Sequence, residues 1–217
     1  MYNHIFPITY IQKNLADELD KGEIDSIIAD MKKERETDPN LIKNKAGNWM
    51  TFDKLLLTKR YANSTLTKVL REYLNQYRLE ILGVTDNELE ITESWVNFCQ
   101  KGAGHHMHNH FNSVLSGTFY LDLKEGEGGE LVIVDNRNRG TIHHRSEPNY
   151  HNVSEIYITP KKYDLLLFPS YMYHYATPNT SDVIRKSLAF NSFYTNGICA
   201  DPVGRSCTGI DFTLNTP

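Results

Sequence analysis

The chain has 217 residues, 40% of them hydrophobic and 23% charged, which is enough for one globular domain and too few for two. Lys and Arg total 23 against 27 Asp and Glu, so the net charge of -4 provides no basic field that would hold a nucleic acid. No apolar run approaches the length of a membrane span and the first residues lack a signal-peptide pattern, so we expect a soluble, cytoplasmic protein with no membrane partner.

The first part of the chain has the hydrophobic period of a helix. Hydrophobic residues within Leu15–Met31 recur every three to five positions after Asn14, a suitable N-cap, and predict an amphipathic helix. A second helix is predicted over 66–81, where the period stops before Gly83. We expect residues 1–88 to form a helical layer that packs on the rest of the domain.

The remainder, residues 89–217, has shorter segments that are rich in β-branched and aromatic residues and are separated by turn-forming clusters. No helical pattern lies between these segments, which favours antiparallel pairing. We expect a mostly β fold with N-terminal helices, in which this part is a jelly roll, also called a double-stranded β-helix, within one compact domain. The predicted strands span 90–99, 114–123, 130–135, 154–159, 164–168 and 183–194.

A cluster of histidines is the main chemical signal, because four of the nine histidines fall within six positions. Alternate side chains of an extended chain point the same way. The residues that would share one face are His106, His108, His110 and Asn112. Two such imidazoles can bind one transition-metal ion, with His174 as the candidate for a remote third ligand. A solvated loop that binds metal only incidentally is the alternative.

The last predicted strand carries the second signal. Arg185 and Ser187 share one face of it, opposite Leu188 and Phe190. A guanidinium near a hydroxyl suits a small carboxylate, because both groups donate hydrogen bonds to its oxygens. Burying an unpaired arginine is costly, so an inward Arg185 implies an anion, which is either an internal Asp or Glu or a ligand. The alternative is an edge strand with a solvated arginine.

Six short motifs follow one another between about residues 92 and 193, roughly half of the chain. They are Ser94-Trp95-Val96-Asn97, His108-Asn109-His110, Leu115-Ser116-Gly117-Thr118-Phe119-Tyr120-Leu121, Gly128-Gly129-Glu130-Leu131, Leu166-Leu167-Phe168-Pro169-Ser170 and Arg185-x-Ser187-x-Ala189-Phe190-Asn191. Each motif is weak alone. In this order they resemble the iron(II)- and 2-oxoglutarate-dependent oxygenases, in particular a family of bacteria and tailed phages that is distantly related to prolyl hydroxylases.

The resemblance implies a double-stranded β-helix with Fe(II) in its mouth and with 2-oxoglutarate and O2 as cosubstrates. The implied activity couples oxidative decarboxylation of 2-oxoglutarate to succinate with oxidation of a C–H bond, as a hydroxylase does. The site residues that it implies are His108, His110 and His174 for the metal and catalysis, and Arg185, Ser187 and Asn97 for 2-oxoglutarate.

The chain departs from the superfamily's usual His-x-Asp or His-x-Glu pair. The second position holds His110 if His108 leads the pair, or Asn112 if His110 leads it, and we favour the first arrangement. Two other functions stay open. One is a cupin-like three-histidine dioxygenase that does not use 2-oxoglutarate, and the other is a non-catalytic β-sandwich binding module.

Several expectations concern the surroundings of this site. The cysteines, Cys99, Cys199 and Cys207, are too few and too scattered for a disulfide framework and are expected to be reduced. The substrate could be a small molecule or a peptidyl residue. The loop 136–152 could form a lid, and the N-terminal helices could pair two copies of the chain as a homodimer.

Overall fold

The computed structural model describes residues 7–137, 147, 149, 152–198 and 210–213. The helices are α1 (Lys21–Thr37) and α2 (Thr65–Glu80), with a π-helical turn at Leu56–Arg60. The strands are β1 (Ile11–Asn14), β2 (Ile42–Lys43), β3 (Trp49–Met50), β4 (Leu89–Cys99), β5 (His105–His108), β6 (Leu115–Asp122), β7 (Leu131–Val134), β8 (Glu155–Ile158), β9 (Asp164–Pro169), β10 (Tyr173–Ala176), β11 (Arg185–Tyr194), β12 (Asn196–Ile198) and β13 (Ile210–Thr213).

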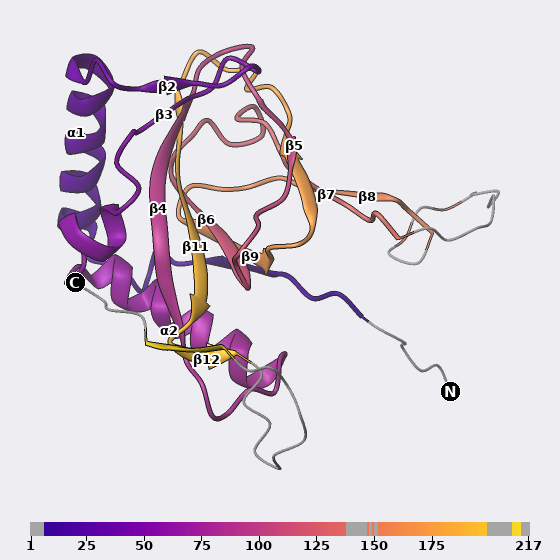
Figure 1. The fold of residues 1–217 in the computed structure, drawn as a ribbon. Coiled ribbons are helices and arrows are strands. Elements are labelled where there is room, and N and C mark those ends of the chain that lie inside the picture. Colours follow the sequence, from indigo (N-terminus) through magenta and orange to yellow (C-terminus); the bar gives the residue numbers. More distant parts are fainter. Residues whose placement is uncertain (1–6, 138–146, 148, 150–151, 199–209, 214–217) are drawn as a thin grey trace.

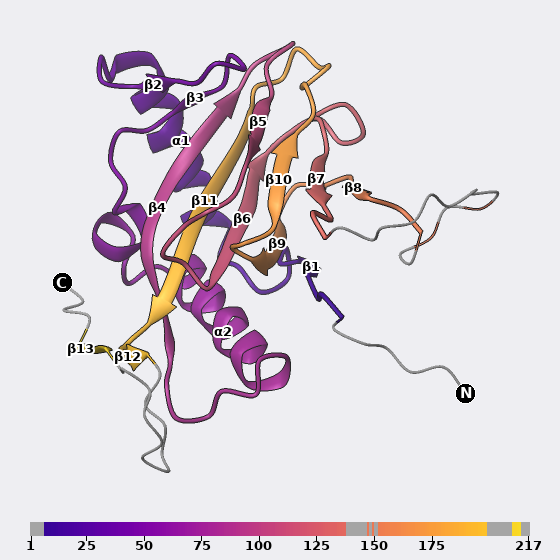
Figure 2. The same ribbon diagram turned by 45° about the vertical axis from the view of Figure 1, so that its right-hand side comes forward.

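Two antiparallel sheets form the body of the domain (Figures 1 and 2). The larger sheet has the order β1-β9-β6-β11-β4-β3-β2, and the smaller one has the order β5-β10-β7-β8. The strands β12 and β13 pair separately. The mostly β jelly roll that the sequence predicts is thereby confirmed. Each of the six predicted strands is present close to its predicted bounds, as β4, β6, β7, β8, β9 and β11.

Both helices lie on the outer face of the larger sheet (Figure 1). Each helix begins at a side-chain cap, because Asp20 accepts the backbone N–H of Glu23 and Ser64 accepts that of Thr67. Their buried faces and the outward residues of the sheet form one hydrophobic core. Its members include Ile24, Ile27, Met31, Leu70, Leu74, Val96, Phe119, Leu188 and Phe190. No described helix has the length and hydrophobicity needed to span a membrane.

The start of the chain differs from the prediction. The proposed helix start at Asn14 is wrong, because residues 11–14 form β1 and α1 begins only at Lys21. The Asn14 side chain accepts a hydrogen bond from the backbone N–H of Ala16 and donates one to Asp164 of β9. It therefore links the edge strand β1 to β9 instead of capping a helix. The second predicted helix is confirmed as α2.

The residues before β4 form strands of the larger sheet as well as the two helices. The strand β1 pairs with β9, and β3 pairs with β4 and carries β2, so both edges of the larger sheet come from this part of the chain. The division of the chain at residue 88 stays a prediction.

A second, smaller hydrophobic core lies between the two sheets. Tyr120 and Phe168 of the larger sheet pack there with Leu131 and Ile133 of the smaller sheet. Tyr120, Leu131 and Phe168 also line the pocket described below, so the pocket is built on the packed interior of the jelly roll.

Candidate active site

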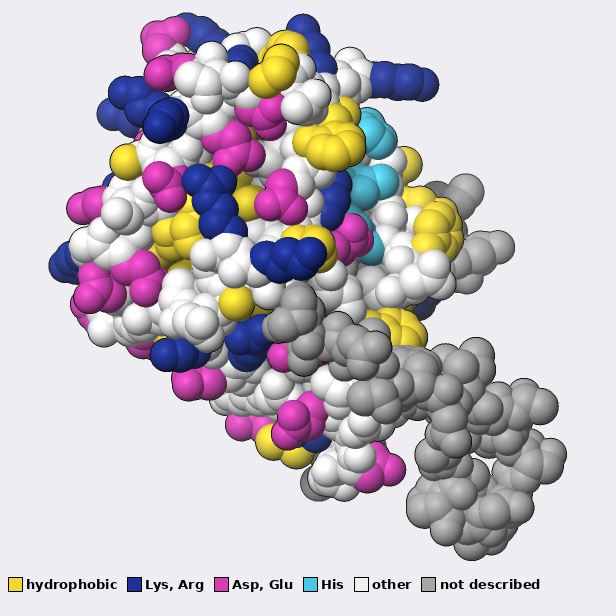
Figure 3. All heavy atoms as spheres, turned by 60° about the vertical axis from the view of Figure 1, so that its left-hand side comes forward, with side chains coloured by type: hydrophobic (Ala, Val, Ile, Leu, Met, Phe, Trp, Pro, Cys, Tyr) yellow, Lys and Arg dark blue, Asp and Glu magenta, His cyan; other side chains and the backbone are white. Residues whose placement is uncertain are grey.

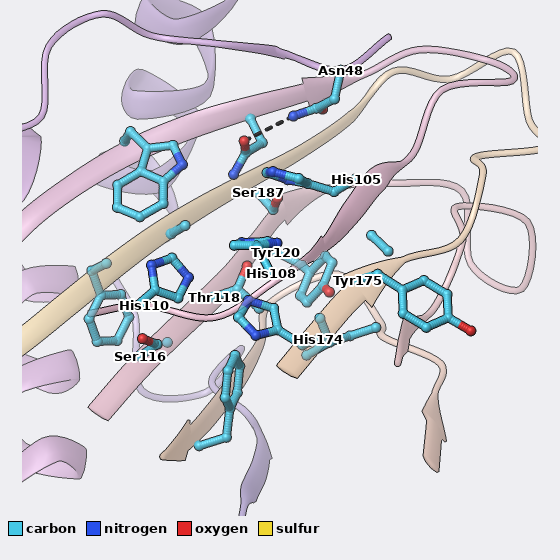
Figure 4. Close-up of a pocket in the computed structure, with 18 of the residues that line it drawn as sticks. Asn48, His105, His108, His110, Ser116, Thr118, Tyr120, His174, Tyr175 and Ser187 are labelled. Atoms are coloured by element: carbon cyan, nitrogen blue, oxygen red, sulfur yellow. Dashed lines mark hydrogen bonds between the residues drawn. The ribbon is translucent and has the colours of Figure 1, made fainter. Parts of the chain in front are cut away.

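The three predicted histidines come together at one end of the space between the sheets (Figure 4). The pairing of β5 with β10 places His108 directly opposite His174. The ring centroids of these two residues are 4.3 Å apart, and His110 lies 5.0 Å from His108 and 5.2 Å from His174. Their possible ligand atoms all lie within 4.8 Å of one another, so one ion could contact all three.

A bulge in β5 decides which histidines face inward. His108 pairs with His174 and His105 pairs with Ala176, so three steps along β5 match two steps along β10. His105 therefore lines the pocket, and His106 is exposed. The ring of His106 lies 5.4 Å from that of His108, but His106 does not line the pocket, because strict alternation fails across a bulge.

The alternative ligand Asn112 lies away from this cluster. It is exposed, has a positive φ of 55° and is not among the residues that line the pocket. The chain is no longer extended after His108, so the prediction that Asn112 continues the inward face is wrong.

Hydrogen bonds orient two of these rings, and burial keeps all three uncharged. His108 donates from Nδ1 to the carbonyl oxygen of His106 at 2.8 Å, and His174 donates from Nδ1 to that of Met172 at 3.0 Å. In a neutral ring this leaves the lone pair of Nε2 free. Burial lowers the pKa of His174 to about 3 and that of His110 to about 4, and it also lowers the pKa of His108. At neutral pH the rings are uncharged, as metal binding requires.

Arg185 points into the same pocket and is 4% exposed. Its Nη1 donates to the carbonyl oxygen of Gly128 at 2.8 Å, and its buried Nε has no hydrogen-bond partner. Among the described residues, none of the ion pairs involves Arg185. Gly129 makes room for it, because a Cβ at that position would lie 2.8 Å from Nη1. An unpaired buried guanidinium favours an anionic ligand over the internal acid that the sequence left open.

Ser187 and Asn97 line the pocket together with Arg185. Ser187 of β11 lies between Asn97 of β4 and Tyr120 of β6 in the larger sheet. Burial raises the pKa of Tyr120 to about 12, so its hydroxyl stays protonated and can donate a hydrogen bond. The expected position of Tyr120 follows from alternation along β6, although the sequence interpretation did not use it.

Asn48 and Trp95 are pocket residues that the sequence interpretation missed. Asn48, in the segment that leads into β3, donates to Oδ1 of Asn97 at 3.0 Å (dashed line in Figure 4). Its own Oδ1 and the Nε1 of Trp95 are buried without a partner. No local signal marks Asn48, because only the pairing of β3 with β4 brings it to the site. Unpaired buried polar atoms around one pocket are expected where a polar ligand binds.

The pocket opens to the surface near the histidines. Figure 3 shows histidine side chains, in cyan, at the surface with hydrophobic side chains beside them. Met107 and Phe111, next to the histidine pair in sequence, are exposed by 57% and 81%. The cysteine Cys99 is a buried free thiol, and Cys199 and Cys207 lie outside the described residues. Most of the proposed lid, 136–152, also lies outside them.

The fold and the site define a class of protein. The fold is a jelly roll, and its mouth combines three uncharged histidines that fit one metal ion with a buried arginine that fits the carboxylate of a ligand. Residues 93–191 match the model of the family described as "Putative 2OG-Fe(II) oxygenase". The matched part is a little under half of the chain. No match is found among the curated protein sequences.

Solved structures of 2OG-Fe(II) oxygenases share this fold. The non-heme α-ketoglutarate-dependent carbocyclase SnoK from nogalamycin biosynthesis is 15% identical, with a TM-score of 0.61 over 94% of this chain and 89% of that one. A Pseudomonas putida prolyl-4-hydroxylase is 17% identical, with a TM-score of 0.52 over 85% and 92%. HygX from Streptomyces hygroscopicus, solved with nickel, 2-oxoglutarate and hygromycin B, is 14% identical, with a TM-score of 0.55 over 85% and 82%.

Proposed function

We propose that this protein is an Fe(II)- and 2-oxoglutarate-dependent dioxygenase that acts as a hydroxylase. The observation that carries the proposal is the buried Arg185, which has no carboxylate partner and lines the same pocket as the three histidines. When bound, iron and 2-oxoglutarate supply the activation of O2 for oxidation of a C–H bond, with succinate and carbon dioxide as products. The residues that we assign are His108, His110 and His174 for the metal and catalysis, and Arg185, Ser187 and Asn97 for 2-oxoglutarate.

The protein's own residues would bind and orient 2-oxoglutarate and would exclude water from the pocket. Arg185 would neutralise the distal carboxylate of 2-oxoglutarate, and the hydroxyls of Ser187 and Tyr120 would donate to its oxygens. These donors lie on neighbouring strands of one sheet, so little side-chain freedom is lost when the ligand binds. The packed core between the sheets keeps water from one side of the pocket, which strengthens these electrostatic interactions.

Arg185 also separates this function from the two alternatives. A three-histidine dioxygenase without 2-oxoglutarate needs no buried cation in its pocket, and its histidines alone would account for the chemistry. In a binding module with a structural metal, protein ligands would fill every coordination position of the ion. Here the histidines line an open pocket.

The test replaces Arg185 with Met, which keeps much of the side-chain volume and removes the charge. Binding of 2-oxoglutarate to the Mn(II)-loaded protein, measured by calorimetry, should weaken by about 100-fold or more, because a buried charge pair is lost. Affinity for Mn(II) should stay nearly constant. The matched control is Lys186→Met, the next residue on β11, whose Nζ is paired with Asp122 at 2.8 Å. Unchanged 2-oxoglutarate affinity in Arg185→Met would contradict the proposal.

The reaction type and the substrate need their own test. Solved structures with this fold include an epimerase and a carbocyclase as well as prolyl hydroxylases, so the fold is compatible with several oxidative outcomes. We propose a small-molecule or peptidyl substrate and a hydroxylated product, in a reducing cytoplasmic compartment that keeps Cys99 as a thiol. Succinate release from 2-oxoglutarate should increase with the right substrate, and mass spectrometry should find one added oxygen. A product without added oxygen would contradict hydroxylation.

A homodimer formed through the N-terminal helices is also proposed. Light scattering after size exclusion should give twice the mass of one chain. A mass equal to one chain across micromolar concentrations would contradict it.

A further inference from the structure

Asn191 lies deep beside the histidine cluster, on the inward face of β11. Its side chain is 2% exposed, and each of its polar atoms is engaged. Nδ2 donates to Oε1 of Glu93 at 2.6 Å and lies 3.1 Å from Nδ1 of His110, while Oδ1 accepts from Oγ of Ser116 at 2.7 Å. Both amide hydrogens of Asn191 therefore have a partner, and one of these partners is a ring nitrogen of the proposed metal centre.

The surroundings fix which way the amide of Asn191 faces. An ionised carboxylate can only accept hydrogen bonds, so Glu93 requires the nitrogen of the amide. Lys54 lies close enough to Glu93 for their charges to interact. On the other side, Ser116 lies 2.8 Å from Oγ of Ser170, from which it can accept while donating to Asn191. Turning the amide over would place two acceptors face to face at Glu93.

This orientation determines where His110 carries its proton. Because Nδ2 of Asn191 is a donor, Nδ1 of His110 must accept, and a neutral ring then holds its hydrogen on Nε2. We infer that Asn191 is a positioning residue that keeps the proton of His110 on Nε2. His108 and His174 have the opposite arrangement, because each donates from Nδ1 to a backbone carbonyl and leaves Nε2 free.

The three histidines are thus not equivalent, a consequence that rests on the proposed function. In the metal-free protein His108 and His174 offer lone pairs to a metal, whereas His110, which we assign to the same site, offers a hydrogen-bond donor until its proton moves. An anionic ligand at the metal would receive a hydrogen bond from His110. Direct binding by His110 through Nε2 would require the ring to move its proton or the amide of Asn191 to turn.

The first test observes the proton itself. Long-range 1H–15N correlation spectra of the 15N-labelled, metal-free protein distinguish rings protonated at Nδ1 from rings protonated at Nε2, and the variant His110→Gln assigns the signals of His110. We expect His110 to carry its proton on Nε2, and His108 and His174 to carry theirs on Nδ1. A proton on Nδ1 of His110 would overturn the inference.

The second test reverses the hydrogen bonds with little change in shape or charge. In the double variant Glu93→Gln/Asn191→Asp, the amide and the carboxylate exchange positions, so the group beside His110 becomes an acceptor. The proton of His110 should then move to Nδ1 and free Nε2 as a third ligand. Changes around a metal-binding histidine typically alter affinity by about 10- to 100-fold, and we expect a gain of this size for Co(II).

The control adds His110→Gln to the double variant, which should remove the gain in Co(II) affinity. A double variant that folds but binds Co(II) no more tightly than the wild-type chain would contradict the inference. If neither protein binds Co(II), the proposed metal centre is wrong, and the correlation spectrum of the wild-type chain still decides where His110 holds its proton.

Discussion

His174 and His106 show how burial separates histidines of one cluster. His174 is 6% exposed and faces His108, whereas His106 is exposed and is not among the residues that line the pocket. We predict that His174→Ala weakens Co(II) binding by about 100-fold or more, because it removes a ligand, and that His106→Ala leaves the affinity within about twofold. Calorimetric titration measures both. A large loss in His106→Ala would instead place the metal at the neighbouring group of His105, His106 and His108.

Individual pocket residues could be predicted from the sequence where a strand is regular. Arg185 and Ser187 lie two positions apart on β11, so alternation alone predicts that they share a face, and both line the pocket. The same rule fails for His105, because a bulge adds a residue that no local pattern announces. Asn48 was beyond prediction, since its place depends on pairing with a strand far along the chain.

Gly117 shows how closely two elements approach each other. It lies opposite Phe190 where β6 pairs with β11, and a Cβ on Gly117 would fall 2.2 Å from Cζ of that ring. We predict that Gly117→Ala lowers the free energy of unfolding by about 1–3 kcal/mol through overpacking. Adding Phe190→Leu should recover part of this loss, because it removes the clashing ring atoms. Urea unfolding of both single variants and the double variant gives the coupling, and purely additive losses would contradict the packing argument.

Elements with a hydrophobic pattern of their own were easier to predict than elements held mainly by their partners. The six predicted strands and α2 have hydrophobic patterns of their own, and all of them are present. The strands β1 and β10 have four residues each, and they are held by pairing with β9 and with β5 and β7. Ile11 is the only hydrophobic residue of β1, so the helical period that begins at Leu15 outweighed it in the prediction. Short strands whose partners are distant in sequence leave little local signal.

The buried histidines make the stability of the whole molecule depend on pH. Burial lowers the pKa of His105 and His174 to about 3 and that of His110 to about 4, whereas in the unfolded chain a histidine has a pKa near 6.5. Below about pH 6.5 the unfolded chain therefore binds protons that the folded chain does not. The metal-free protein should keep its full stability above this pH and lose it as the pH falls toward 4, by up to about 1.4 kcal/mol per pH unit for each histidine.

Urea unfolding in the presence of a chelator, at several values between about pH 7.5 and 5, measures this slope. The variant His105→Gln should show a shallower dependence, because one of the buried titrating groups is gone. Equal free energies of unfolding at both ends of the range would mean that the histidines are protonated as easily in the folded chain as in the unfolded one.

The central claim is that distant segments of the chain bring a metal and a keto acid together between the two sheets. Anomalous diffraction from crystals grown with Mn(II) and 2-oxoglutarate tests it most directly. We predict one manganese peak within bonding distance of Nε2 of both His108 and His174, with a carboxylate of 2-oxoglutarate on the guanidinium of Arg185. A peak held instead by His105 and His106, or a keto acid that leaves Arg185 without an anion, would contradict it.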